Sequence, residues 1–231
     1  MTTEIKEQDT YFLPFNMGKG EGVDQGAGNP HNESGPDTAY FWKEVLAKDS
    51  ILQLIERFIF LKVDRDKKSK KALIFPRYQQ RRAVNRVLED MKVNHTDSNY
   101  LIQHSAGSGK TNTIAWLAHS LVSLHDHEDR NVVDAVLIVT DRIVVDRQLQ
   151  DAVQAQPGVI KVMDEKATSS DLADALAGNT KIIATTIHKF AQINKSDWMT
   201  AGPTAQKRFA ILIDEAHSST TGSYMSAVSQ V

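Results

Sequence analysis

From residue 72 onward, short apolar runs alternate with amphipathic stretches along the chain. Residues 135–139 and 210–213 are continuously apolar, and residues 181–185 contain the pair Ile182-Ile183. Runs of this kind are typical of strands that are buried on both faces of a parallel sheet. The stretches between them carry apolar residues at helical spacing, namely Ile114, Leu117, Ala118 and Leu121, and then Leu172, Ala175 and Leu176. The alternation of strand and helix predicts an α/β domain built on a doubly wound, mainly parallel sheet.

The region before this domain has a different pattern. Six of the twelve glycines lie between Gly18 and Gly35, which indicates an irregular loop. Two helical patterns follow, at residues 38–46 and 49–59. Residues 64–71 are almost all charged and predict an exposed connector, although their lysines also suit a contact with DNA. We therefore expect an N-terminal part of residues 1–71 and a main domain of residues 72–231.

Composition narrows the class of protein. The formal net charge is -2, so any contact with nucleic acid must come from a local basic surface. The absence of cysteine excludes a disulfide framework and a thiolate metal site. The polar N-terminus does not resemble a secretory signal, and no apolar run approaches the roughly 20 residues of a membrane helix. We therefore expect a cytoplasmic protein without a membrane partner.

The sequence HSAGSGKT at residues 104–111 has the pattern of a phosphate-binding loop. It lies between the apolar pair Leu101-Ile102, which we expect in a short strand, and an amphipathic stretch that we expect to be helical. The consensus has glycine where His104 stands, and the other positions fit it. An ordinary glycine turn before a helix is the alternative, which the predicted order of strand, loop and helix disfavours.

The residue types of this loop suit a nucleotide. Its glycines allow backbone N–H groups to face a phosphate, and the start of the helix offers a positive dipole end. Lys110 is suited to bridge the β- and γ-phosphates, and the Thr111 hydroxyl to ligate Mg²⁺. We therefore predict a site for ATP and Mg²⁺ that includes Gly107, Ser108, Gly109, Lys110 and Thr111.

Two carboxylates, Asp214 and Glu215, come directly after the last apolar run and begin the sequence DEAH. Ligands of open α/β sheets bind at the carboxyl ends of the strands, where this pair is expected. Asp214 is suited to hold Mg²⁺ through water and Glu215 to polarise the attacking water, so we predict that both act with Lys110 in catalysis. His217 is expected to couple the nucleotide state to other parts of a motor. By itself, the segment is also compatible with the exposed start of a helix.

A glutamine upstream of the loop is a candidate for reading the base. In the segment 75–83, FPRYQQRRA, the amide of Gln80 can donate to and accept from the adenine edge. An aromatic side chain nearby can stack on the base. The same segment also predicts an amphipathic helix after Pro76, and the two interpretations are compatible.

Together these motifs resemble the superfamily-two helicases. The segments FNMGKG, GAGNP, TAYFWKEVL, HSAGSGKT, IVTDRIVVDRQLQ, IATTIHKF and LIDEAHSS resemble the R subunit of type I restriction enzymes, from about Phe12 to Ser219. The resemblance implies a RecA-like domain of an ATP-dependent DNA translocase. It assigns Gln80 to the adenine-binding motif, and it implies DNA contacts through Thr140, Arg142, Thr185 and Thr186. Pairing of Arg142 with Asp146 on the next helix is the alternative for that arginine.

The resemblance also implies partners and a larger assembly. The expected partners are double-stranded DNA and the methylation and specificity subunits of the restriction complex. A second RecA-like domain with an arginine finger is expected after DEAH, so the chain is interpreted as a truncated motor. A DEAH-like DNA-repair helicase and a nucleotide-binding module without turnover remain alternatives. The segment His125–Asp129 is rich in metal-ligand residue types, but its spacing does not define a metal geometry, and a solvated loop is favoured.

Overall fold

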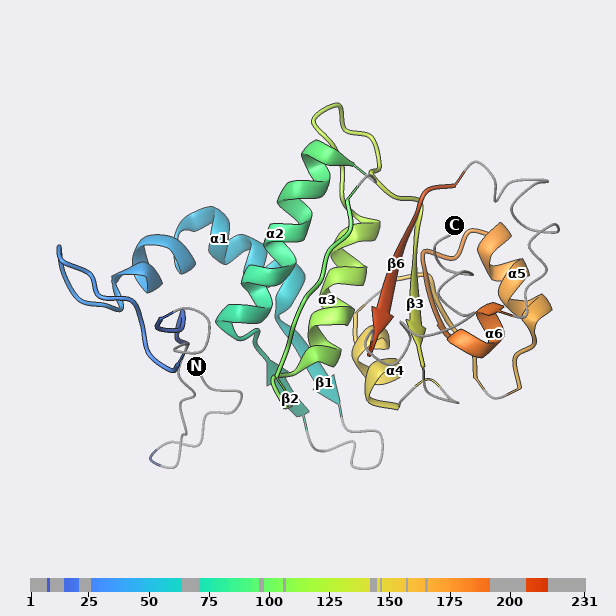
Figure 1. Cartoon of the computed structure of the whole chain (residues 1–231), viewed down its shortest axis with the longest axis horizontal. Helices are drawn as coiled ribbons and strands as arrows, with labels where there is room; N and C mark the ends of the chain where they lie inside the picture. Colours follow the sequence, from blue (N-terminus) through green and yellow to red (C-terminus); the bar gives the residue numbers. More distant parts are fainter. Residues whose placement is uncertain are drawn as a thin grey trace. The chain divides into compact units, whose positions relative to one another are not determined.

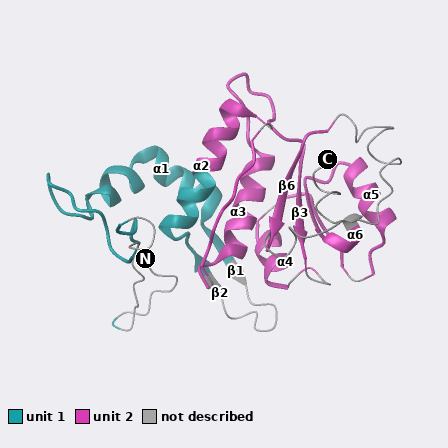
Figure 2. Ribbon diagram, viewed as in Figure 1, with its two compact units in different colours: residues 1–85 teal, residues 86–231 magenta. Residues whose placement is uncertain are grey.

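The computed structural model describes residues 8, 15–20, 26–63, 71–95, 98–105, 107–141, 145, 147–156, 158–164, 166–191 and 207–215. The chain forms two compact units, Met1–Asn85 and Arg86–Val231 (Figure 2). Helix α2 (Tyr78–Asn94) begins in the first unit and ends in the second. The boundary that we expected after residue 71 stays a prediction.

Short helical segments and a hairpin form the first unit. The π-helical turn η3 (Phe41–Val45) precedes helix α1 (Lys48–Gln53), which continues into a second π-helical turn, η4 (Leu54–Phe58). These segments fall within the two predicted helical patterns, apart from the start of α1. Strands β1 (Phe60–Val63) and β2 (Lys71–Ile74) then pair antiparallel. This hairpin was not predicted. Each strand has only four residues, and Lys71, the first residue of β2, was included in the predicted charged connector.

Aromatic side chains pack around Phe15 in the first unit. The ring of Phe15 makes edge contacts, with ring centroids 5.7–5.9 Å apart, to Phe41, Phe75 and Tyr78. Tyr40 packs in the same way against Tyr78, and its hydroxyl donates a hydrogen bond to the carbonyl of Phe15. Each such ring pair contributes about 0.5–1.5 kcal/mol beyond the area that it buries. The loop that carries Phe15 is thereby attached to η3 and to the start of α2.

A parallel sheet of four strands forms the centre of the second unit (Figure 1). Its order is β4-β5-β3-β6, with all three neighbouring pairs parallel. The strands are β3 (Ala135–Thr140), β4 (Ile160–Val162), β5 (Ile182–Thr186) and β6 (Phe209–Asp214). Every residue of β3 and β5 is buried, as the apolar runs predicted.

Helices cover both faces of this sheet. Helices α3 (Lys110–Val122) and α4 (Arg147–Gln154) lie on one side, and α5 (Ser169–Ala177) and α6 (Ile187–Ala191) lie on the other (Figure 1). The three layers confirm the predicted α/β class with a parallel sheet. Among the described helices, none has both the length and the apolar character that crossing a membrane requires.

The side chains of β3 divide between the two faces because they alternate along the strand. Leu137 and Val139 belong to one buried cluster with Ile183 of β5 and with the α5 residues Leu172 and Leu176. The intervening side chains of β3 therefore point to the layer that contains α3. The predicted apolar stripe of α5 is buried throughout, and that of α3 is buried except for the half-buried Ile114.

The strand that we expected before the phosphate-binding loop is absent. Residues 98–105 have no regular structure, and Leu101 is 88% exposed. The prediction was wrong because two apolar residues are too few to occupy both faces of a strand, and their neighbours are polar.

The edges of the sheet also differ from the sequence pattern. Strand β6 is only half-buried along its length, although its apolar run predicted burial on both faces. It lies at the edge of the described sheet and pairs with β3 alone, so part of its surface stays exposed. Strand β4 was not predicted at all, since its three residues alternate two apolar side chains with Lys161.

Candidate functional site

The carboxyl ends of three neighbouring strands lie in register in the second unit. Thr140 ends β3 and is paired with Thr186 at the end of β5 and with Asp214 at the end of β6. The start of α3 meets the same edge, because Lys110 Nζ lies 3.9 Å from Asp214 Oδ1. Open α/β sheets bind their ligands outside this edge, so the chemistry of the domain is expected here.

The loop before α3 has the backbone geometry of an anion-binding turn. Gly107 and Gly109 have φ angles of 72° and 87°, a region that other residues rarely occupy. Gly109 is the N-cap of α3, and its carbonyl accepts from the N–H groups of Asn112 and Thr113 at 3.1 and 3.3 Å. The first N–H groups of a helix have no partner within it, and its N-terminus carries positive partial charge. The half-buried Thr111 lies in this first turn.

The ammonium group of Lys110 connects this loop to the carboxylates of β6. It donates a hydrogen bond to Glu215 Oε1 and lies near Asp214. The Lys110 side chain is 37% exposed, that of Asp214 15% and that of Glu215 31%. The fold thus brings the predicted catalytic residue Lys110 together with two others, Asp214 and Glu215, that lie about a hundred positions later in the sequence. Their action on a nucleotide stays a prediction.

Glu215 occupies an unusual backbone conformation directly after β6. Its φ is 58°, in the left-handed region that costs a residue with a side chain roughly 1–2 kcal/mol. Such positions cluster at active sites because the surrounding structure must hold them there.

His104, the residue that departs from the loop consensus, bridges the two arms of the loop. Its Nδ1 lies 3.2 Å from the hydroxyl of Ser108, and Ser108 is 7% exposed. The backbone N–H of Ser108 also donates to the carbonyl of Ser105 at 3.2 Å. Burial, together with the cation of Lys110, lowers the pKa of His104 below its usual value. The departure from glycine was visible in the sequence, but the contact between His104 and Ser108 was not predicted.

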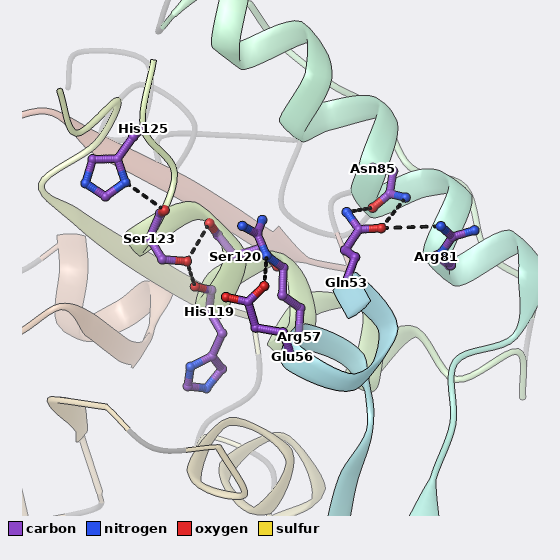
Figure 3. Close-up of polar contacts among 9 residues, drawn as sticks. All are labelled: Gln53, Glu56, Arg57, Arg81, Asn85, His119, Ser120, Ser123 and His125. Carbon is purple, nitrogen blue, oxygen red and sulfur yellow. Dashed lines mark hydrogen bonds and ion pairs between the residues drawn. The ribbon is translucent and has the colours of Figure 1, made fainter. Parts of the chain in front are cut away.

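Gln80 lies in the first turn of α2, in the first unit, where it is almost completely buried. Its Oε1 accepts a hydrogen bond of 2.7 Å from the backbone N–H of Arg77, which stabilises the start of the helix. Further along α2, Asn85 exchanges two hydrogen bonds of 3.1 Å with Gln53 of α1, and Arg81 donates a third to Gln53 (Figure 3). These bonds connect α1 to α2. The contact of Gln80 with adenine stays a prediction.

The residues that the resemblance assigns to DNA contacts are covered or undescribed. Thr140, Thr185 and Thr186 are each at most 1% exposed. A contact between their hydroxyl groups and DNA requires that the covering segments move. Arg142 and His217 lie outside the described residues. All five assignments stay predictions.

The loop after α3 is held by hydrogen bonds around Asp126. The Asp126 carboxylate accepts from the backbone N–H groups of Glu128 and Arg130 and from the Arg130 guanidinium. These bonds lower the pKa of Asp126 to about 2. Among the described residues, no group of three or more His, Cys, Asp or Glu is arranged to hold a metal ion. The residues at 125–129 form part of a hydrogen-bonded turn.

Comparison with known proteins gives two findings. The family model of the SWI2/SNF2 ATPases matches residues 79–231, a range that contains the loop, Lys110 and both carboxylates. The chain is also 26% identical, in an alignment of 204 positions that covers 78% of its length, to a protein of Methanocaldococcus jannaschii. That protein is described as the MjaVIIIP endonuclease subunit of a type I restriction enzyme. The matched part of this chain spans 19% of the length of that relative.

Proposed function

The chain belongs to the SWI2/SNF2 ATPase family, and from this premise we propose that it is the ATP-binding part of a DNA translocase in a type I restriction enzyme. The observation that carries the proposal is the meeting of Lys110 with Asp214 and Glu215 at the carboxyl edge of the sheet. Family membership supports the use of ATP. The description of the M. jannaschii relative supports the restriction-enzyme setting over a DNA-repair helicase.

The residues of the site have different roles in hydrolysis. The loop N–H groups and the start of α3 bind the phosphates, and Lys110 neutralises charge on the transferred phosphoryl group. The ammonium group of Lys110 donates a hydrogen bond to Glu215. Binding of ATP draws the ammonium group to the phosphates and releases the Glu215 carboxylate. That carboxylate is then available to polarise the attacking water.

The oxygen atoms at this edge suit Mg²⁺. This ion prefers oxygen ligands and keeps several of its waters, so one hydroxyl and one carboxylate suffice to position it. Thr111 in the first turn of α3 and Asp214 at the end of β6 would hold it, the carboxylate through water. When bound, Mg²⁺ neutralises charge on the β- and γ-phosphate oxygens.

The wider assembly is part of the same proposal. The motor would move along double-stranded DNA, and the methylation and specificity subunits of a cytoplasmic restriction complex would be its protein partners. Thr140, Arg142, Thr185 and Thr186 would contact the DNA backbone, and His217 would couple ATP binding to movement. Since phosphate contacts carry no sequence information, DNA recognition would belong to the specificity subunit.

Binding of Mg-ATP by the purified chain tests the first step. Lys110→Ala is expected to weaken the affinity by about one to two orders of magnitude, since a charge-assisted contact contributes roughly 1.5–3 kcal/mol. Lys92→Ala, which removes an exposed lysine of α2, is the matched control and should leave the affinity unchanged. Equal affinities of the parent and Lys110→Ala in calorimetry would contradict the assignment.

Turnover distinguishes a motor from a module that only binds nucleotide. ATP hydrolysis that rises on addition of duplex DNA, and that Glu215→Gln abolishes, is the result expected of a motor. Binding without turnover, measured in the presence of the remainder of the motor subunit, would favour the module.

A further inference from the structure

His104 stands where the loop consensus has glycine, and the proposed mechanism leaves it without a role. Its Nδ1 contacts the hydroxyl of Ser108 at 3.2 Å, so one side chain connects the first position of the loop with the residue before its last glycine. The Nε2 atom is shielded from solvent and has no hydrogen-bond partner among the described residues. The imidazole is thus neither a solvated surface group nor a fully satisfied core histidine.

Burial and a nearby cation disfavour protonation of this imidazole. The described charged groups at the site are Lys110 at the start of α3 and Asp214 and Glu215 at the end of β6. Both carboxylates are directed to Lys110, and burial, together with the cation of Lys110, lowers the pKa of His104. A second N–H on the ring would also leave a buried donor without an acceptor, which is costly.

A bound polyphosphate reverses this balance. The nucleotide brings several negative charges to the loop, engages the cation of Lys110 and supplies oxygen acceptors. A nearby opposite charge favours the protonated imidazole. On this basis, which rests on the proposed ATP site, we infer that His104 is a positioning residue that holds the loop through Ser108 and takes up a proton when the nucleotide binds.

Proton uptake by His104 would make the affinity for the nucleotide rise as the pH falls. Because the bound state holds the proton more tightly than the free state, the gain in affinity is complete below the free-state pKa of His104. It is lost as the pH rises through the pKa of the bound state. The free-state pKa lies below the usual 6.5, so the window opens below that pH. One linked proton changes the affinity by at most about tenfold per pH unit.

Calorimetry of Mg-ATP binding to the full chain, in buffers of different ionisation enthalpy, measures the proton taken up. The γ-phosphate of the nucleotide titrates at a pH of roughly 6 as well. The parent and each variant are therefore compared in identical solutions, so that this contribution cancels. His104→Asn keeps a group that can bond to Ser108 but cannot gain a charge. His104→Ala removes both properties, and His125→Asn replaces an exposed histidine after α3 as the matched control.

We expect uptake of up to one proton by the parent and by His125→Asn at a pH between the free-state and bound-state pKa values of His104. His104→Asn should retain the affinity of the parent at pH 8 within about twofold and lose the uptake, whereas His104→Ala should lose both. Equal proton uptake by the parent and His104→Asn would overturn the inference and leave the proposed function intact. A parent chain that does not bind Mg-ATP would overturn the proposed function and this inference with it.

Discussion

Replacing Glu215 by glutamine is expected to tighten the binding of Mg-ATP while it abolishes hydrolysis. The carboxylate of Glu215 accepts a hydrogen bond from Lys110, and under the proposed function this ion pair competes with a phosphate for the ammonium group. Glutamine keeps the shape of the side chain and one acceptor oxygen but removes the negative charge. It also removes a charge that would repel the phosphates.

The size of the effect follows from the exposure of the pair. With 37% of the Lys110 side chain and 31% of the Glu215 side chain exposed, the pair is closer to a surface ion pair than to a buried one. Solvent screening limits such a pair to about 0.5–1 kcal/mol. Since 1.4 kcal/mol is a factor of ten, the affinity should rise roughly two- to fivefold. Screening by salt should reduce the gain, because both groups contact solvent.

Isothermal calorimetry at low and at high salt measures this gain. Glu128→Gln is the matched control, because it neutralises an exposed glutamate that pairs with Arg130 in the loop after α3. That variant should bind Mg-ATP like the parent at both salt concentrations. If Glu215→Gln binds no more tightly than the parent, or binds more weakly, then the ion pair does not compete with the nucleotide and our account of Lys110 is wrong.

Three further predictions concern other parts of the chain. Thr168→Ala should lower the free energy of unfolding by about 1 kcal/mol in urea, because Thr168 and Asp171 form a capping box at the start of α5; an unchanged midpoint would show that the cap contributes nothing. Burial lowers the pKa of His119, so below pH 6.5 the unfolded state takes up a proton that the folded state does not, and the free energy of unfolding of the parent should fall. His119→Asn should show a weaker pH dependence of unfolding. Equal pH dependence of the parent and the variant would show that His119 does not cause the effect. Gln80→Ala should weaken ATP binding and leave GTP binding nearly unchanged, and a parent that binds both nucleotides equally would remove Gln80 from the adenine site. Because the Gln80 amide also accepts from the Arg77 N–H, the unfolding of this variant should be measured beside its binding.

The class of fold could be predicted because it rests on local periodicity. The runs at 135–139 and 210–213 are apolar without interruption, and 181–185 contains the pair Ile182-Ile183, a pattern typical of short strands in a parallel sheet. The glycines and the lysine of the loop at 104–111 could be recognised from residue type and spacing alone, and Gly107 and Gly109 do adopt the positive φ that glycine favours. The hairpin at β1 and β2 and the strand β4 were missed because strands of three or four residues have too few positions to show a period.

The sequence alone determined which residue types lie in the loop before α3 and at the end of β6, and these types predict a site for phosphate and Mg²⁺. The tertiary structure decided how they meet. It paired Thr140 with Asp214 across parallel strands and turned Glu215 to a positive φ. It placed Lys110 between two carboxylates about a hundred positions away, and it set His104 against Ser108. No local pattern encodes these contacts, because the distance between residues far apart in the chain depends on the order in which the strands assemble and on the packing between them.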